Sequence, residues 1–182
     1  MRYVIGADCG STKCLIKAKD FEGNLLATSM GKTTNHLLIG LNEAKRRIVK
    51  QVNDLIASFN GKKEDCACIV VGAAGIDSAK DKEIIYGFYN SLVVNCPIFC
   101  MNDGNLALYS ATKGVGIQAI SGTGSIVVGR NAEGMVTRSG GYPATIFGNE
   151  GSSQWIAYNA LNYASKYLDK SVESSLLIEL ID

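Results

Sequence analysis

The opening of the chain places hydrophobic residues in the short runs and alternations that are typical of β-strands. Residues 3–7 form an apolar run, residues 14–19 alternate, and residues 25–29 follow a turn at Glu22-Gly23-Asn24. The first two stretches enter and leave a tight turn of small residues, as the strands of a β-hairpin do. The pattern predicts three successive strands that form an antiparallel meander.

A helical period then replaces the strand period. After a polar segment over residues 31–36, which we expect to be a loop, the apolar residues of segment 41–59 recur on one face of a helix. These residues are Ala44, Ile48, Val52, Leu55, Ile56 and Phe59. The pair Asn60-Gly61 is a typical helix end. The pattern predicts an amphipathic helix over residues 41–59.

Strands and helices alternate from there to residue 112. Residues 66–72 form a continuous apolar run, which is typical of a strand buried on both faces of a parallel sheet. Ser78, with Asp81 as its capping partner, predicts a helix that reaches residue 92. A strand over 97–101 and a helix opened by Asn102-Asp103-Gly104 follow. The order βββαβαβα predicts an α/β fold with a mixed sheet, in which the meander continues into parallel strands with helical crossovers.

The second part of the chain begins as the first does. Three strands are expected over 117–121, 126–130 and 135–139, followed by a glycine-rich loop over 140–151. Helices are expected over 152–168 and, at the end, over 173–180. This unit has its meander and first helix but lacks the later strands and helices of the first. We therefore expect an N-terminal lobe over 1–114 and the beginning of a similar second lobe over 115–182, from the front of a longer protein. The alternative is a second unit that is naturally short.

Composition narrows the function classes. The chain is 47% hydrophobic and 19% charged with a net charge of +1, and it has no block of basic residues. A nucleic-acid surface needs clustered cations, so nucleic acid is not an expected partner. We assign Lys45-Arg46-Arg47 to the solvated face of a helix. No apolar run approaches the roughly eighteen residues of a membrane helix and no signal-peptide layout is present, so a cytoplasmic protein is the expectation.

The cysteines do not form a recognisable metal pattern. Four of the six lie in apolar strand-like runs, where a free cysteine behaves as a small buried hydrophobic residue. They are Cys66, Cys68, Cys96 and Cys100. Their spacing does not match a four-cysteine zinc site, and the single His36 supplies no second type of ligand. We expect reduced core thiols rather than ligands of a metal or a cluster.

Two turns of small residues are candidates for phosphate binding. Gly10, Ser11, Thr12 and Lys13 form the first, and Gly122, Thr123, Gly124 and Ser125 repeat it. Glycines let the backbone approach a ligand closely, and successive N–H groups in a turn make a concavity for anions. Asp8, at the end of the first strand, would hold Mg²⁺ beside the phosphate oxygens. The alternative is a turn-forming Asp before an ordinary hairpin, and the repetition of the turn favours phosphate.

Asp103 follows a buried strand and opens a helix, which is where open α/β sheets place their ligands. A carboxylate there can accept the proton of a substrate hydroxyl that attacks a γ-phosphate. Asp103 can equally cap the helix, and the two roles are compatible. Asn35, Asn149 and Glu150 lie in loops and offer donors and acceptors for sugar hydroxyls. An ordinary loop explains these three equally well.

Five motifs occur in an order that resembles the N-acetylglucosamine kinase and BadF/BcrA-type ATPase family, within the sugar kinase, Hsp70 and actin superfamily. They are Asp8-Cys9-Gly10-Ser11-Thr12-Lys13, Gly72-Ala73-Ala74-Gly75-Ile76-Asp77, Asn102-Asp103-Gly104, Ile120-Ser121-Gly122-Thr123-Gly124-Ser125, and Gly140-Gly141-Tyr142 through Gly148-Asn149-Glu150-Gly151-Ser152. The resemblance spans nearly the whole chain. It implies a ribonuclease H-like, actin-type ATPase lobe followed by the start of a second one.

The segment from Thr33 to Gly40 is similar to the N-acetylglucosamine kinase branch, whose Asn contacts the sugar. The resemblance implies ATP and Mg²⁺ as cofactors, Asp103 as catalytic base, Thr12 and Thr123 near the phosphates, and Asn35, Asn149 and Glu150 near the sugar. Three residues depart from the family pattern. Cys9 replaces a usual Gly, Cys14 a usual Thr or Ser, and Asn149 a usual Asp.

We therefore expect ATP-dependent phosphorylation of a sugar hydroxyl, with N-acetylglucosamine or a related hexose as the small-molecule partner. One alternative is an ATPase that activates a redox enzyme through a cluster shared between subunits, which needs cysteines at a dimer interface. Another is a non-catalytic sugar or nucleotide sensor, which the departures at Cys9, Cys14 and Asn149 would allow. A homodimer is left open.

Overall fold

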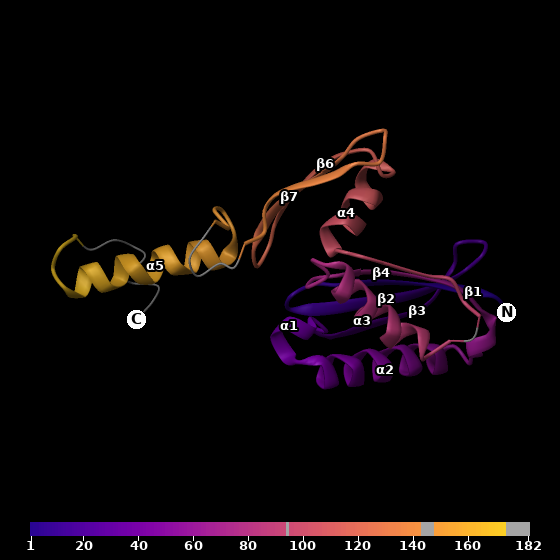
Figure 1. The fold of residues 1–182 in the computed structure, drawn as a ribbon. Helices are drawn as coiled ribbons and strands as arrows, with labels where there is room; N and C mark the ends of the chain where they lie inside the picture. Colours follow the sequence, from indigo (N-terminus) through magenta and orange to yellow (C-terminus); the bar gives the residue numbers. More distant parts are fainter. Residues whose placement is uncertain (94, 143–147, 174–182) are drawn as a thin grey trace. The chain divides into compact units, whose positions relative to one another are not determined.

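The computed structural model describes residues 1–93, 95–142 and 148–173 (Figure 1). It divides into two compact units, Met1–Gly114 and Val115–Asp182, and each is described by itself. Most of the helix expected over 173–180 and part of the loop expected over 140–151 lie outside the described residues. In the described part of the chain, no helix combines the length and the apolar character needed to cross a membrane.

The first unit is built on a five-stranded mixed sheet in the order β3-β2-β1-β4-β5. Its strands are β1 (Tyr3–Cys9), β2 (Lys13–Asp20), β3 (Leu25–Lys32), β4 (Cys66–Ala73) and β5 (Ile98–Met101). The first three pair antiparallel, whereas β4 pairs parallel with β1 and with β5. The predicted mixed sheet is confirmed.

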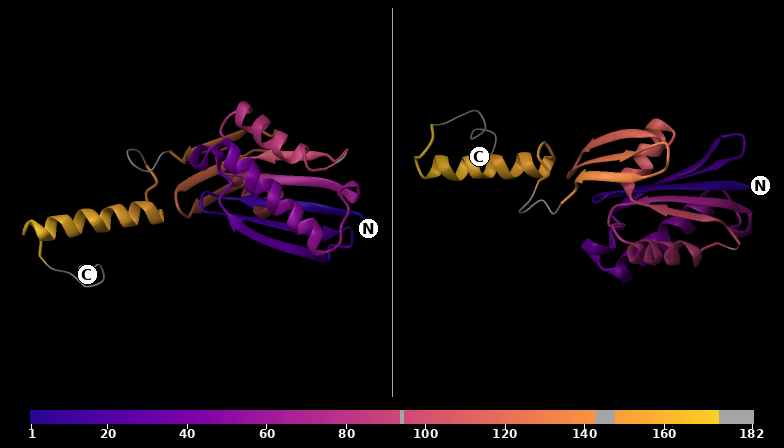
Figure 2. Two further views of the ribbon diagram at one scale, coloured as in Figure 1. Left: turned by 90° about the horizontal axis from the view of Figure 1, so that it is seen from below. Right: turned by 45° about the horizontal axis from the view of Figure 1, so that its top comes forward.

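Helices cover both faces of this sheet (Figure 2). They are α1 (His36–Ile39), α2 (Leu41–Ser58), α3 (Ala79–Asn90) and α4 (Asp103–Thr112), and a 3-10 turn, η1, spans Lys63–Asp65. Helices α2 and α3 lie on one face, where they bury the side chains that alternate along β1 and β4. The pairs Ile5 with Ile69 and Ala7 with Val71 belong to this core. Since successive residues of a strand alternate between faces, Asp8 and Gly72 belong to the face opposite α2 and α3.

Helix α4 packs close to that other face. A Cβ atom at Gly72 would lie 2.5 Å from the Cβ of Leu106, so only glycine lets α4 approach β4 this closely. Asn102 caps α4 by accepting a hydrogen bond from the backbone N–H of Gly104 at 2.9 Å. The first turn of α4 is therefore held at the carboxyl end of β5.

Two local expectations were wrong. Strand β3 runs on to Lys32, where it still pairs with Lys13, so residues 31 and 32 are not part of a loop. Asn35 caps the short helix α1, which was not predicted. A helix of four residues is too short to show a hydrophobic period, and its cap is the local signal that marks it.

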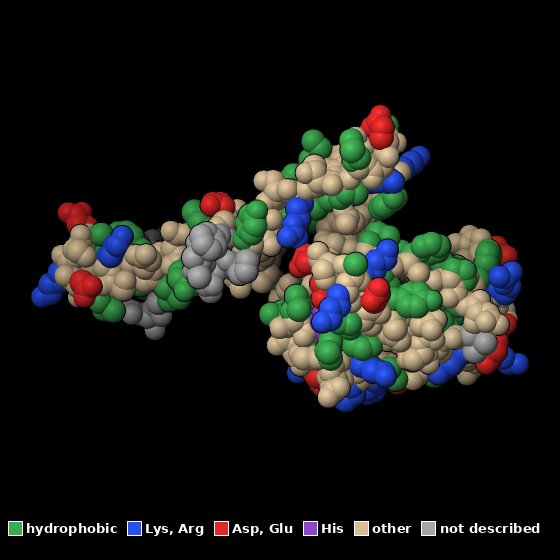
Figure 3. Space-filling model, in the orientation of Figure 1, with side chains coloured by type: hydrophobic (Ala, Val, Ile, Leu, Met, Phe, Trp, Pro, Cys, Tyr) green, Lys and Arg blue, Asp and Glu red, His purple; other side chains and the backbone are tan. Residues whose placement is uncertain are grey.

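The second unit contains a three-stranded antiparallel sheet and one helix. Strands β6 (Gly116–Ser121), β7 (Ser125–Arg130) and β8 (Val136–Gly140) follow one another, and α5 spans Ser153–Leu168. Ser152 caps α5 by accepting a hydrogen bond from the N–H of Trp155. Among the described residues of this unit, Val128 is the one buried hydrophobic side chain, and α5 buries none. On the face shown in Figure 3, basic and acidic side chains are intermingled on both units.

Candidate functional site

The first small-residue turn is the tip of the β1–β2 hairpin. Cys9 and Cys14 are its last paired residues, and Gly10, Ser11 and Thr12 form the tip. Strand β1 extends to Cys9, and Asp8 is its penultimate residue, near the end of the strand as predicted. In the sheet register Asp8 stands beside Gly72. It therefore shares the sheet face against which α4 packs.

Asp103 is the first residue of α4, at the carboxyl end of β5. Its Oδ1 accepts a hydrogen bond from the N–H of Gly104 at 3.0 Å, but the cap proper is Asn102, which also donates through Nδ2 to the carbonyl of Ile76. Capping alone therefore does not explain the carboxylate at position 103. Burial raises the pKa of the Asp103 carboxyl above its ordinary value, the Gly104 N–H opposes the rise, and negative charge on Asp8 and Asp77 adds to it.

Asp8, Asp77 and Asp103 follow or end three neighbouring parallel strands, β1, β4 and β5. The carboxyl ends of such strands are where α/β sheets bind ligands. Within the described ranges, no group of three or more His, Cys, Asp or Glu side chains is close enough to hold a metal by itself. The donor set fits Mg²⁺, which commonly takes one or two carboxylates and completes its shell with water and phosphate oxygens.

Asn35 lies against the loop between β4 and α3. Its Oδ1 accepts a hydrogen bond from the N–H of Leu37 at 3.0 Å, and Gly75, with a φ of +91°, approaches the same oxygen. A Cβ atom at Gly75 would lie 2.5 Å from it. The Nδ2 of Asn35 has no hydrogen-bond partner among the residues that the structure describes. One side-chain donor therefore remains for a ligand.

The second small-residue turn is the tip of the β6–β7 hairpin. Ser121 pairs with Ser125, and Gly122 donates a backbone hydrogen bond to Gly124 at 2.9 Å. The start of α5 holds this tip from behind. Ser153 donates to the carbonyl of Gly122 at 2.9 Å, and Gln154 donates to that of Thr123 at 3.3 Å. The two predicted hairpins are thus present, one in each unit.

Asn149 supports the second tip. It is buried, its Oδ1 accepts from the N–H of Ser125 at 2.8 Å, and its Nδ2 donates to the carbonyl of Tyr142 at 2.8 Å. Both ends of the amide are therefore engaged within the protein, whereas Glu150 is exposed. A sugar contact for either residue stays a prediction, and the structure gives Asn149 a supporting role that the sequence did not suggest.

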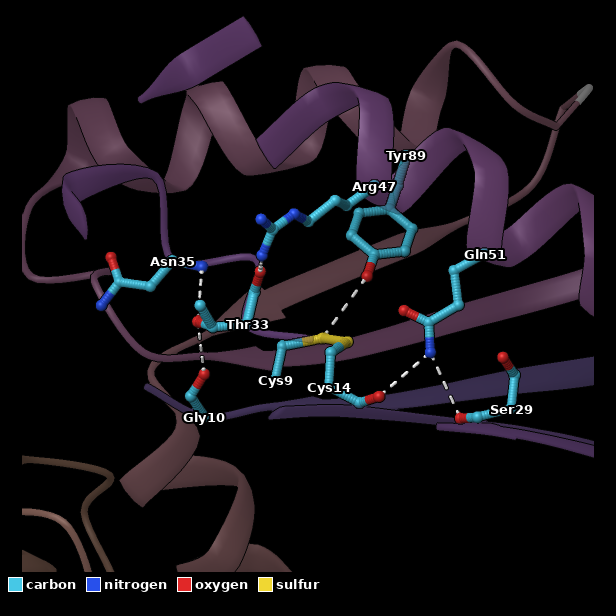
Figure 4. The surroundings of a disulfide bond; sticks show 9 residues. All are labelled: Cys9, Gly10, Cys14, Ser29, Thr33, Asn35, Arg47, Gln51 and Tyr89. Atoms are coloured by element: carbon cyan, nitrogen blue, oxygen red, sulfur yellow. Dashed lines mark hydrogen bonds between the residues drawn. A yellow bond between two sulfur atoms is a disulfide. The ribbon is translucent and has the colours of Figure 1, made fainter. Parts of the chain in front are cut away.

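Cys9 and Cys14 are joined by a disulfide at the first tip (Figure 4), which was not predicted. The hydroxyl of the fully buried Tyr89 lies 3.9 Å from the Sγ of Cys9. Gln51 donates through Nε2 to the carbonyls of Cys14 and Ser29, at 3.0 and 3.2 Å. The sequence does contain a signal for this disulfide. Cys9 and Cys14 flank a short predicted hairpin turn, and residues in such positions are cross-strand neighbours.

The other four cysteines are free. Cys66, Cys96 and Cys100 are buried and Cys68 is half-buried. The Sγ of Cys96 lies 3.6 Å from that of Cys66. Burial, and then this hydrogen bond, raises the pKa of the Cys66 thiol to about 12. The thiolate of Cys66 is therefore scarce at neutral pH.

Residues 5–175 match the model of the BadF/BadG/BcrA/BcrD ATPase family. The chain belongs to this family. The match covers the first hairpin, Asp103 and the second hairpin in one alignment, so the family resemblance is confirmed over nearly all of the described chain.

Curated relatives of this family member are sugar kinases by name. The chain is 36% identical over 178 residues to an N-acetylmuramic acid/N-acetylglucosamine kinase from Clostridium acetobutylicum, and 31% identical over 189 residues to an N-acetyl-D-glucosamine kinase from Dictyostelium discoideum. Each match covers 97% of the chain and 58% of the relative. The chain thus spans little more than half the length of these relatives.

A solved structure confirms the fold. The structure of a putative N-acetylglucosamine kinase from Chromobacterium violaceum superposes with a TM-score of 0.82 at 24% identity, over 100% of this chain and 63% of that one. A second, from Porphyromonas gingivalis and of the same description, gives a TM-score of 0.74 at 20% identity. The actin-type ATPase fold predicted from the motifs is confirmed.

Proposed function

We propose that the protein containing this chain transfers the γ-phosphoryl group of ATP to a hydroxyl of N-acetylglucosamine or a related amino sugar. The identity to two curated kinases of these sugars supports this proposal. The observation that carries it is Asp103, a half-buried carboxylate at the carboxyl end of β5 with a raised pKa. Asn102, and not Asp103, caps α4, so the carboxylate is not needed as the helix cap.

Asp103 would act as the general base. It would accept the proton of the sugar hydroxyl on a carboxylate oxygen as that hydroxyl attacks the γ-phosphate. A raised pKa brings a carboxylate closer to the operating pH, where general bases are most effective. Asn35 would hold the sugar through the Nδ2 donor that no described residue uses.

The two hairpin tips would bind the phosphates through backbone N–H groups. In this proposal residues 10–13 contact one part of the triphosphate and residues 122–125 another, with the units 1–114 and 115–182 as a first lobe and the start of a second. Asp8 would hold Mg²⁺, which would neutralise charge on the phosphate oxygens. Closure of such lobes excludes water, so that the sugar and not solvent takes the phosphoryl group.

A coupled ADP-release assay on the complete protein tests this function. N-acetylglucosamine, N-acetylmuramic acid and unmodified hexoses are compared as substrates, with and without Mg²⁺. Asp103→Asn is expected to lower turnover by about 10²- to 10⁴-fold, the usual contribution of a general base. Asp54→Asn, which changes an exposed carboxylate on α2, is the matched control and should leave turnover unchanged. An Asp103→Asn variant with full turnover would remove Asp103 from the mechanism.

The same assay separates the alternatives. Sugar binding without ADP release would indicate a sensor. A redox activator requires exposed cysteines that share a cluster. In the part of the chain that the structure describes, Cys68 is half-buried, the other free cysteines are buried, and the remaining two are bonded to each other. This arrangement does not favour the redox function.

A further inference from the structure

Thr33 connects the first small-residue turn to the segment that carries Asn35 (Figure 4). Its hydroxyl donates to the carbonyl of Gly10 at 3.0 Å and accepts from the backbone N–H of Asn35 at 3.1 Å. Its own N–H donates to the carbonyl of Thr12 at 3.1 Å. One side chain thus connects two segments to which the proposed function gives different ligands.

Helix α2 holds Thr33 in this place. Arg47 donates through Nη1 to the carbonyl of Thr33 at 2.8 Å, and through Nε to Glu43 at 2.7 Å. Arg47 is therefore not simply part of a solvated helix face, as its sequence context suggested. The backbone of Thr33 is thus held by Arg47, while its hydroxyl donates to Gly10 and accepts from Asn35.

The two hydrogen bonds of the Thr33 hydroxyl run in the same donor-to-acceptor direction. The N–H of Asn35 donates to the Thr33 hydroxyl, which donates to the carbonyl of Gly10. That carbonyl shares its peptide group with the N–H of Ser11, one of the donors proposed for phosphate. In a chain of hydrogen bonds with one direction, each bond polarises and strengthens the next. An anion bound at the Ser11 N–H would therefore strengthen the bond that orders Asn35.

We propose that Thr33 is a positioning residue that couples nucleotide binding at the first turn to sugar binding at Asn35. The proposal rests on the function proposed above. Binding of either ligand tightens the Gly10, Thr33 and Asn35 hydrogen bonds and so favours binding of the other. Coupling between two sites is reciprocal, so nucleotide must raise sugar affinity by the same factor by which sugar raises nucleotide affinity.

Calorimetry on the complete protein measures this coupling. The dissociation constant of N-acetylglucosamine is determined alone and in the presence of Mg²⁺ and a non-hydrolysable ATP analogue. The unmodified protein is expected to bind the sugar about 5-fold or more tightly with the analogue present, the lower end of typical coupling. Thr33→Val keeps the shape but loses the hydroxyl, so the ratio of the two constants should fall. Thr33→Ser keeps the hydroxyl and should restore the difference.

A merely structural role for Thr33 would lower stability without changing the ratio of the two constants. Equal constants in the unmodified protein, or an undiminished ratio in Thr33→Val, would overturn the proposal. Thr33→Ala serves as a second variant if Thr33→Val does not fold.

Hydrogen exchange of the unmodified protein tests the same proposal with neither a variant nor a sugar. Addition of the analogue alone should slow exchange of the Asn35 amide, and unchanged exchange with the analogue bound would overturn the proposal. If the analogue protects Asn35 but no amino sugar binds, the proposed function fails while the link from nucleotide to Asn35 stands. If neither ligand binds, both are overturned.

Discussion

The two antiparallel meanders of the molecule, β1–β2–β3 and β6–β7–β8, have the same topology but different surroundings. In the first, Ile16 on the middle strand is fully buried, and α2 packs against this strand. In the second, Ile117 is 75% exposed and Val128 is the one buried hydrophobic side chain of the described residues. The difference teaches that the meander does not make a core by itself. The parallel strands and their crossover helices supply the second layer that buries it.

The hairpin tips differ in how they are held, although both present small residues. The first is closed by the Cys9–Cys14 disulfide and connected through Thr33. The second is held by the side chain of Asn149 and by the first N–H groups of α5. Each tip is therefore attached to a segment that follows its meander in sequence. A similar shape is reached with different chemistry.

The largest test of the comparison is the same substitution in each sheet. Ile69→Ala should destabilise the protein by about 2–5 kcal/mol, because it leaves a cavity between β4 and its covering helices. Ile117→Ala should cost less than about 0.5 kcal/mol, as exposed positions do. Urea unfolding followed by circular dichroism measures both. A comparable cost at Ile117 would show that the second sheet is covered in solution.

A glycine pair tests how closely helices approach the first sheet. Gly72→Ala should cost about 1–3 kcal/mol, because its Cβ meets the Cβ of Leu106, and it should lower kcat by displacing Asp103 with α4. Gly6→Ala in β1 is the matched control, since no atom lies within 4 Å of its added Cβ. Thermal unfolding and the ADP-release assay are the measurements. Equal effects of the two substitutions would contradict the close approach of α4.

Helix caps provide a comparison between the units with smaller effects. Ser78→Ala removes the capping box of α3, and Ser152→Ala removes the cap of α5. Each should cost about 1 kcal/mol. Amide hydrogen exchange distinguishes the two substitutions. Ser78→Ala should speed exchange at the Asp81 amide in the first unit, and Ser152→Ala should speed exchange at the Trp155 amide in the second. Faster exchange in both units from one substitution would show that the units unfold together.

The pH dependence of stability should have opposite signs at two aspartates of the first unit. The folded-state pKa of Asp103 is raised, so its ionisation opposes folding above that pKa. Asp103→Asn should thus stabilise the protein at neutral pH, and the gain should vanish as the pH falls below about 4. The pKa of Asp20 is lowered, chiefly by a hydrogen bond from Asn24, so Asp20→Asn should destabilise at neutral pH and not in acid. Urea unfolding at several pH values tests both signs.

Much of the fold was predictable because its signals are local. Short apolar runs, together with the alternation over residues 14–19, indicated the strands. Ser78 and Asp81 indicated the start of α3, and small residues indicated both hairpin tips. The position of Asp103 between a strand and a helix was predicted, whereas its catalytic role stays a prediction. The short helix α1 was not predicted because four residues are too few to show a helical period. The disulfide was not predicted because it depends on the cross-strand pairing of Cys9 with Cys14, which the spacing of the cysteines alone does not show.

By itself, the sequence determined the order of the elements, the composition of the two turns and the family to which they belong, since each depends on residues close together in the chain. The tertiary structure decided which acidic side chains share a face of the sheet. It also decided that Asn102 and not Asp103 caps α4, and that Thr33 connects Gly10 to Asn35. These relations join residues on different elements. They depend on strand register and on which face each crossover helix covers, and neither is written in any one stretch of residues.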